Sequence, residues 1–291
     1  MELKNLYILF FLFISSSINA QSLNGIIQDS ESKEPLPFSN LVLLNSKTGA
    51  YSNHSGYFSL MINQNSNDTL KISSIGFESL LIPIKELIKI EKVVFNLKQK
   101  SYLLDEIILS NKKIEYSKKH RLGKNRVGNL SVSSLVGQEY CIYIDNKFKE
   151  NGLLKSVIIS LKKRENENFI SPLRIKIYKY NKIKNIPGEE LLLKNLIIQV
   201  KNKKYELNVN LEKYKIPFLK DGICIGVEWL DPNNETNNFD RIGPALRYSY
   251  IDDNSYSWTN YQNRGWKNGI MKYENNKKAI PLINIEVLMI K

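Results

Sequence analysis

The chain has 291 residues, of which 42% are hydrophobic and 24% are charged, and its formal net charge is +13. This composition excludes disorder throughout the chain, and the length is sufficient for two modest domains of ~100 to 200 residues each. The positive charge favours anionic partners such as acidic polysaccharide or lipid head groups, or it only reflects a sequence rich in Lys, Asn and Ile. Nucleic acid is not an expected partner, because no recognition motif for it is present.

Residues 1–20 are typical of a secretory signal peptide. Lys4 precedes an apolar run from Leu6 to Ile14, and small or polar residues then lead to Ala20. The apolar run is about half of the ~18 residues that a membrane span needs. We therefore expect cleavage after Ala20 and no transmembrane segment in the mature chain. The protein would be exported to the periplasm, the outer membrane surface or the exterior.

Residues 21–98 show the alternation of apolar and polar side chains that half-buried strands have. Phe58, Leu60 and Ile62 fall on one side of a strand, and Leu70 and Ile72 repeat the pattern. Turn-forming residues separate these runs, including the Ser52 to Gly56 stretch between two strands. The stretch predicts a small all-β sandwich with one buried face per strand.

Several motifs in this stretch resemble the carboxypeptidase regulatory-like domain. They are Gly25–Asp29, Pro35–Val42, Ser52–Asn53 followed by Gly56–Ser59, and Asp68–Glu78. The family usually has Thr-Asp where Ser52-Asn53 stands here. The resemblance covers roughly a quarter of the chain and implies a transthyretin-like sandwich of about seven strands. It implies no peptidase activity, because the domain is named for its position beside a zinc peptidase and a fold does not determine a function.

Residues 99–129 are interpreted as a basic linker. Its Leu104–Leu109 segment is similar to one that leads from this domain toward the plug of TonB-dependent outer-membrane transporters. Too little chain follows for a transporter barrel, so the resemblance implies the envelope of a Gram-negative bacterium and not transport. The basic run from Lys112 to Arg126 is either a solvated spacer or a patch for acidic glycans or phosphates.

Residues 130–291 predict a second, larger β-sandwich with jelly-roll-like connections. Tyr205 to Glu212 gives the most regular alternation in the chain, and Ile223 to Trp229 and Ile283 to Met289 repeat it. The stretch is similar to sandwich modules of secreted bacterial proteins, without a family that we can name. It contains Cys141 and Cys224, which could form a disulfide in an exported protein or remain two buried thiols.

The residues needed for common catalytic sites are scarce. The two histidines, His54 and His120, have no zinc-ligand spacing, and residues 130–291 contain no histidine to activate a nucleophile. We therefore predict no metal, no cofactor and no enzymatic activity. One alternative is a glycan-active enzyme with a carboxylate pair drawn from Glu228, Asp231, Glu235, Asp240, Asp252 and Asp253. The acidic stretches could also hold calcium or be plain polar loops.

Aromatic residues gather in the last third of the chain, between Tyr248 and Tyr273. Exposed rings with polar neighbours are used for carbohydrate or peptide recognition, although the same rings could line the core. The candidate ligand-binding residues are Tyr256, Trp258, Tyr261 and Trp266, with the two tryptophans as stacking platforms. The sequence thus predicts a non-catalytic binding or structural module whose partner is a polysaccharide or an outer-membrane protein.

Overall fold

The computed structural model is built almost entirely of β-strands. It describes residues 20–63, 67–88, 90, 92–100, 115–124, 127–162, 171–200, 206–231, 242–252, 256–273 and 276–290. Helix in these ranges is limited to short 3-10 stretches, of which Ile84–Glu86 and Glu212–Tyr214 are described in full. Neither is long and apolar enough to cross a bilayer. The all-β prediction is confirmed, whereas the predicted signal peptide lies, except for Ala20, outside the described residues.

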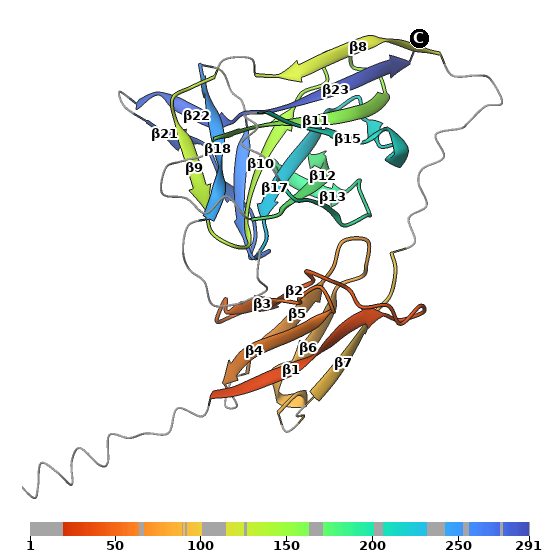
Figure 1. The fold of residues 1–291 in the computed structure, drawn as a ribbon, viewed down its shortest axis with the longest axis vertical. Coiled ribbons are helices and arrows are strands. Elements are labelled where there is room, and N and C mark those ends of the chain that lie inside the picture. Colours follow the sequence, from red (N-terminus) through yellow and green to blue (C-terminus); the bar gives the residue numbers. More distant parts are fainter. Residues whose placement is uncertain are drawn as a thin grey trace, which may run out of the picture.

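The first body consists of strands β1 to β7, which form two sheets in the orders β4-β1-β7 and β3-β2-β5-β6 (Figure 1). Their bounds are β1 Ala20–Asp29, β2 Asn40–Leu43, β3 Gly49–Tyr51, β4 Tyr57–Asn63, β5 Thr69–Ser73, β6 Leu80–Pro83 and β7 Lys92–Leu97. Phe58, Leu60 and Ile62 all point into the core between the sheets, as their alternation predicts. β1 pairs antiparallel with β4 and parallel with β7.

The second body consists of strands β8 to β23. Their bounds are β8 Tyr116–Gly123, β9 Ser131–Ser134, β10 Gln138–Ile144, β11 Gly152–Lys162, β12 Leu173–Asn181, β13 Ile186–Glu190, β14 Leu196–Ile198, β15 Glu206–Asn210, β16 Pro217–Phe218, β17 Ile223–Trp229, β18 Ile242–Ile251, β19 Ser257–Tyr261, β20 Lys267–Asn268, β21 Met271–Lys272, β22 Lys278–Pro281 and β23 Ile283–Ile290. One sheet has the order β13-β12-β17-β10-β19-β20, with β14 beside β12. The other has the order β21-β22-β18-β11-β23-β8, with β15 and β16 beside β11 and β9 beside β18.

Each body has its own hydrophobic core. The core of the first body runs from Leu23 to Leu97, and that of the second from Leu122 to Met289. In the second body the chain passes from sheet to sheet at β10, β11 and β12 and again at β17, β18 and β19, as in a jelly roll. Successive side chains of β12 and β17 point alternately into this core and onto the outer face of the sheet. The outer face carries the candidate site.

Part of the stretch interpreted as a linker is a strand, so that interpretation is wrong for Tyr116–Gly123. These residues form β8, which pairs with β23 at the edge of the second body. The alternation signal is weak because an edge strand tolerates charged side chains, and Leu122 is the one buried residue among those of the strand whose burial is described. Lys119 instead forms an ion pair with Glu286 at 2.8 Å, and Arg121 forms one with Glu206 at 3.3 Å. Residues 101–114 of the expected linker lie outside the described ranges.

Candidate functional site

The outer face of the β13-β12-β17-β10-β19-β20 sheet carries the candidate site, which the strand registers arrange in rows. One row across β12, β17, β10 and β19 contains Arg174, Glu228, Glu139 and Asn260; the next contains Lys176, Gly226, Cys141 and Trp258; a third contains Tyr178, Cys224 and Tyr143. Tyr180 continues β12 beyond the third row. The face therefore has a charged half at one end and an aromatic half at the other.

The charged half is a buried network around one ammonium group. Lys176 Nζ lies 3.1 Å from Glu139 Oε2 and 3.0 Å from Glu228 Oε2. Arg174 Nη1 donates to the same Glu228 oxygen at 3.1 Å. Glu139, Arg174 and Glu228 are only 2%, 4% and 3% exposed. Charges buried this deeply are tolerated only when each has a partner of opposite sign.

The pKa values of the two glutamates shift in opposite directions. Burial alone would raise the pKa of Glu228, but the Lys176 and Arg174 cations outweigh it and lower that pKa to about 2. Burial raises the pKa of Glu139, and the Lys176 cation only partly opposes it. Burial would lower the pKa of Lys176, but the two carboxylates raise it. Glu228 and Lys176 are thus charged at neutral pH.

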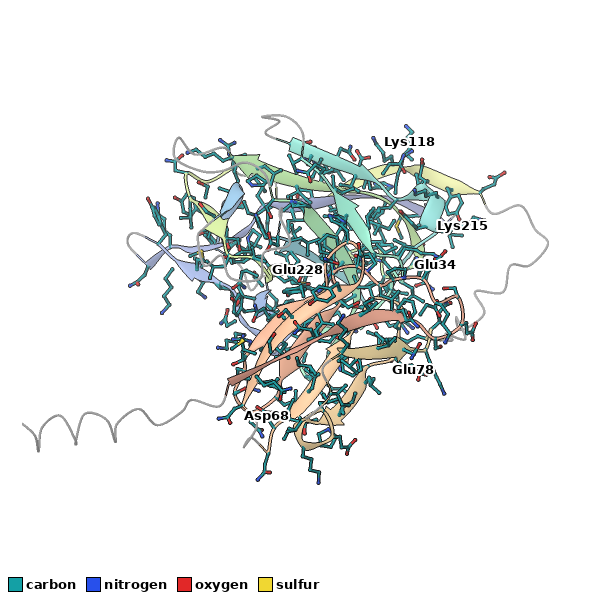
Figure 2. The ribbon with its side chains drawn as sticks, turned by 60° about the horizontal axis from the view of Figure 1, so that its bottom comes forward. Glu34, Asp68, Glu78, Lys118, Lys215 and Glu228 are labelled. Atoms are coloured by element: carbon teal, nitrogen blue, oxygen red, sulfur yellow. The ribbon has the colours of Figure 1, made fainter. Side chains whose placement is uncertain are left out.

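The first body covers the charged half. The Tyr51 hydroxyl donates to Glu228 Oε1 at 3.0 Å, and Arg174 Nη2 donates to the Phe38 carbonyl at 2.7 Å. Figure 1 shows β2 and β3 facing the second body, and Figure 2 places the labelled Glu228 where the two bodies meet. Gly76 permits a close approach here, because an added Cβ would lie 2.5 Å from the Leu193 carbonyl oxygen.

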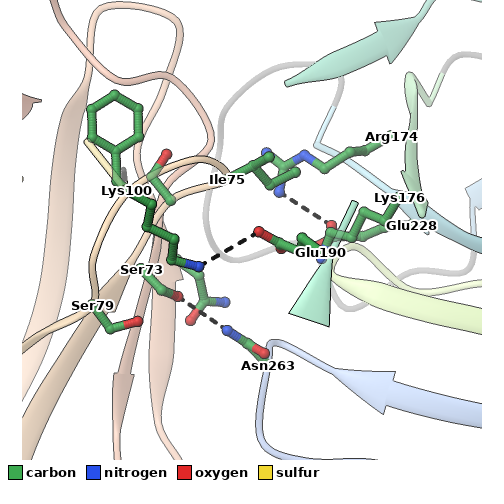
Figure 3. A pocket seen from close by; sticks show the side chains of 12 residues that line it. Ser73, Ile75, Ser79, Lys100, Arg174, Lys176, Glu190, Glu228 and Asn263 are labelled. Carbon is green, nitrogen blue, oxygen red and sulfur yellow. Dashed lines mark hydrogen bonds and ion pairs between the residues drawn. The ribbon is translucent and has the colours of Figure 1, made fainter. Parts of the chain in front are cut away.

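A polar cavity of about 100 Å³ lies beside this contact (Figure 3). The first body lines it with Asn40, Ser73, Ser74, Ile75, Phe77, Ser79 and Lys100, and the second body with Arg174, Lys176, Glu190, Glu228 and Asn263. Across its walls Asn263 Nδ2 donates to Ser73 Oγ at 3.0 Å, and Lys100 faces Glu190 at 3.9 Å. The cavity thus exists only while the two bodies are docked.

The aromatic half consists of two groups of contacting rings. The Tyr256 and Trp258 rings stack with centroids 6.1 Å apart, and Tyr180 stacks on Tyr256 at 6.3 Å. Tyr143 lies 4.3 Å from Tyr180, and Trp266 meets Tyr178 edge to face at 5.6 Å. Such geometries stabilise a ring cluster beyond simple burial of its area.

Polar groups surround these rings. The Tyr143 hydroxyl contacts Asp145 Oδ1 at 3.0 Å and the Asp221 carbonyl at 2.8 Å, and the Tyr180 hydroxyl contacts Asn185 Oδ1 at 2.7 Å. Burial, followed by the hydrogen bond to Asp145, raises the pKa of Tyr143, so its hydroxyl stays protonated at neutral pH. The combination of flat apolar rings and hydrogen-bonding side chains is suited to binding a hydroxyl-rich ligand.

The four aromatic residues predicted from the sequence do not form one accessible group. Tyr256 is 37% exposed and Trp266 is half-buried, so both are accessible. Trp258 is only 6% exposed and its indole N–H donates to the Asn185 carbonyl at 3.0 Å, so its predicted role as a stacking platform is wrong. Tyr261 lies apart from them and packs under the Arg264 guanidinium, 4.9 Å from the ring centroid.

Sequence reasoning missed the rings from strands distant in the chain. Tyr143, Tyr178 and Tyr180 lie on β10 and β12, yet the strand pairing places them beside Trp258 and Tyr256. Their signal was present as two tyrosines two positions apart on β12, Tyr178 and Tyr180, on the side opposite Ile175 and Ile177. Such a pattern indicates an outward aromatic face only when the core-facing side of the strand is known.

Both cysteines are buried free thiols in the same ring cluster, so the structure does not contain the disulfide considered from the sequence. Cys141 lies opposite Gly226 rather than Cys224, because the two cysteines are offset by two residues across β10 and β17. This diagonal offset places them farther apart than directly opposed residues. Burial raises the pKa of Cys141 well above its ordinary value, which favours the protonated thiol at neutral pH.

The acidic candidates do not form an open catalytic pair in the described part of the chain. Glu228 and Glu139 have opposite pKa shifts, as a glycosidase acid and base do, but Lys176 joins them and only Glu228 borders the cavity. Ion networks that serve structure shift pKa values in the same way. Glu235, Asp240 and Asp253 lie outside the described ranges. No cluster of three potential metal ligands occurs among the residues that are described.

The family comparison finds a match that includes the first body. Residues 23–109 match the CarboxypepD_reg-like domain. The match confirms the family resemblance of the N-terminal sandwich, and it covers less than a third of the chain. No curated protein matches the sequence.

Two solved structures resemble the chain only distantly. A candidate carbohydrate binding protein from Bacteroides uniformis ATCC 8492 is 11% identical, with a TM-score of 0.22, over 93% of this chain and 98% of its own. The structure of the infectious bursal disease virus Gx strain is 10% identical, with a TM-score of 0.24, over 93% of this chain and 65% of its own. With TM-scores this low, neither similarity carries an argument about the fold or the function.

Proposed function

We propose that the protein is a non-catalytic binding protein that recognises polysaccharide through the aromatic half of the outer face. The observation that carries the proposal is the set of contacting rings of Tyr143, Tyr180 and Tyr256, of which Tyr256 is the most accessible, with Trp266 packed on Tyr178 in the same half. Flat rings bind the C–H faces of sugars, and the hydroxyls and carboxylates around them bind sugar hydroxyl groups.

The proposal extends to the place of action. The Lys4 to Ala20 pattern and the similarity of Leu104–Leu109 to an outer-membrane segment support export to the envelope or exterior of a Gram-negative bacterium. In such a location polysaccharides are abundant ligands. The CarboxypepD_reg-like domain would then hold the second body in place rather than bind sugar, because its contacts cover the charged half and leave the rings accessible.

The test first measures binding of the mature chain to an array of bacterial and plant polysaccharides. The affinity is then measured for each polysaccharide that binds the chain. Tyr256→Ala removes an exposed ring and is expected to weaken binding by about tenfold, the equivalent of one ring contact. Tyr57→Ala is the matched control, since Tyr57 on β4 is 43% exposed in the first body. Equal affinities of the two variants and the unmodified chain would refute the proposed surface.

A further inference from the structure

The cavity between the two bodies contains buried polar atoms without partners. Asn40 on β2 is 6% exposed and lies near the Tyr51 hydroxyl, yet neither polar atom of its amide makes a hydrogen bond of normal geometry with a described residue. The Nε–H of Arg174, which is 4% exposed, is also without such a partner. Both residues line the cavity. Buried polar groups are rarely left unpaired, so these atoms indicate a missing hydrogen-bonding occupant.

The charges of the cavity wall favour a neutral occupant. Its cations already face carboxylates: Arg174 and Lys176 contact Glu228, and Lys100 faces Glu190. An anion entering the cavity would have to compete with Glu190 and Glu228 for these cations, and a cation would have to compete with the cations for the two carboxylates. A neutral occupant enters without disturbing these ion pairs.

The remaining wall groups match hydroxyl groups. The Asn40 amide offers donors and an acceptor, Arg174 Nε offers a donor, and Ser73, Ser74 and Ser79 carry hydroxyls that do both. Ile75 and Phe77 add apolar surface for C–H groups. A ligand that both donates and accepts hydrogen bonds along a short carbon chain fits this set better than solvent alone, because it satisfies donors and acceptors together.

The geometry points to a second binding site, in which the cavity between the bodies holds a neutral polyol group. A single ordered water needs roughly 10–15 Å³ of such space, so a cavity of about 100 Å³ has room for a small polyol group. The group is either a free polyol or the exposed arm of a larger sugar. The site shares no residue with the aromatic half, so it can be tested independently of the proposed polysaccharide surface.

The test titrates glycerol and maltotriose separately, at millimolar concentration, into the ¹⁵N-labelled mature chain. Glycerol represents a free polyol, and we expect it to cause saturable shifts of the Asn40 side-chain amide resonances. Maltotriose should cause the same shifts if the arm of a larger sugar enters the cavity. Acetate is charged and 1-propanol has a single hydroxyl group, so neither should produce such a shift. Asn40→Leu removes the unpaired amide, and Ser79→Trp obstructs the cavity at an exposed position of the β5–β6 loop.

Both variants should weaken glycerol binding by about tenfold, as expected for the loss of hydrogen bonds or of access. Ser55→Trp, at an exposed turn away from the cavity, should change it less than about twofold. Tyr256→Ala should leave glycerol binding intact, which separates this site from the polysaccharide surface. The inference is overturned if neither glycerol nor maltotriose gives saturable shifts, or if Ser79→Trp binds glycerol as the unmodified chain does.

Discussion

At the scale of residues, one lysine holds together the centre of the contact between the bodies. The Lys176 ammonium is shared by Glu139 and Glu228, which come from two different strands and have opposite pKa shifts. Glu228 also accepts from Tyr51 of the first body. The ammonium thus links the stability of the second body to the docking of the first.

Replacing Lys176 with Met keeps the length of the side chain and removes its charge, which leaves Glu228 with Arg174 alone and takes the ion-pair partner away from buried Glu139. We expect a loss of about 3 kcal/mol or more in the free energy of unfolding, as for other broken buried ion pairs. Lys179→Met on the same strand is the control. Its ion pair with Glu189 is largely exposed, so the loss should stay below about 1 kcal/mol. Urea unfolding followed by tryptophan fluorescence gives both values, and equal losses would contradict the role assigned to Lys176.

At the scale of elements, β17 is buried on both faces. Ile223, Ile225 and Val227 enter the core, while Cys224, Gly226 and Glu228 lie on the outer face. Gly226 stands where the charged and aromatic halves meet, and an added Cβ would lie 2.1 Å from Glu139 Oε1. The absence of a side chain at this position leaves room for the Glu139 carboxylate beside Lys176.

Gly226→Ala should therefore displace the Glu139 carboxylate and destabilise the second body by about 2 kcal/mol, the usual cost of overpacking. Gly188→Ala on β13 is a suitable control, since its added Cβ would meet nothing closer than 3.2 Å. The measurement is the thermal midpoint of each purified variant. A midpoint of Gly226→Ala that is as high as that of Gly188→Ala would show that the network accommodates the methyl group.

The strands themselves were largely predictable from the sequence, whereas the site was not. The alternation of Phe58, Leu60 and Ile62 indicates a buried face without any tertiary information. The grouping of Tyr180 with Tyr256 depends on the register of β12, β17, β10 and β19, which are far apart in the chain. Trp258 was misassigned for the same reason, because its burial comes from neighbours on other strands.

At the scale of the whole molecule, the two bodies meet through polar and charged groups rather than through a shared hydrophobic core. The contact covers the charged half of one sheet and encloses a cavity with walls from both bodies. Such a contact depends on the ionisation of its members. The relative position of the bodies should therefore respond to pH, and so should the stability of the chain.

The pH dependence follows from the two glutamates. The pKa of Glu228 is lowered from 4.5 to about 2, so its stabilising contribution is present above pH 4.5 and is lost as the pH falls toward 2. The pKa of Glu139 is raised, so its protonation in the folded chain adds stability as the pH falls through that raised pKa toward 4.5. The free energy of unfolding should therefore fall most steeply below pH 4.5.

Glu228→Gln should reduce the loss of unfolding free energy below pH 4.5, because it removes the titrating carboxyl group. Glu139→Gln should leave that loss in place. Other carboxyl groups with lowered pKa, Asp68 and Glu286 among them, contribute equally in all three chains. The comparison requires urea unfolding at a series of pH values between about 5 and 2.5. Parallel pH profiles of Glu228→Gln and the unmodified chain would contradict the assignment of a low pKa to Glu228.

The most direct test of the proposed polysaccharide surface uses the indole N–H resonances of the three tryptophans. Trp266 and Trp258 belong to the ring cluster, whereas the Trp229 indole is buried in the core and donates to the Pro244 carbonyl. On saturation of the ¹⁵N-labelled chain with a polysaccharide retained on the array, we expect the Trp266 resonance to shift most and the Trp258 resonance less. The Trp229 resonance should not move. Binding that leaves both Trp266 and Trp258 unchanged would contradict recognition through the aromatic half.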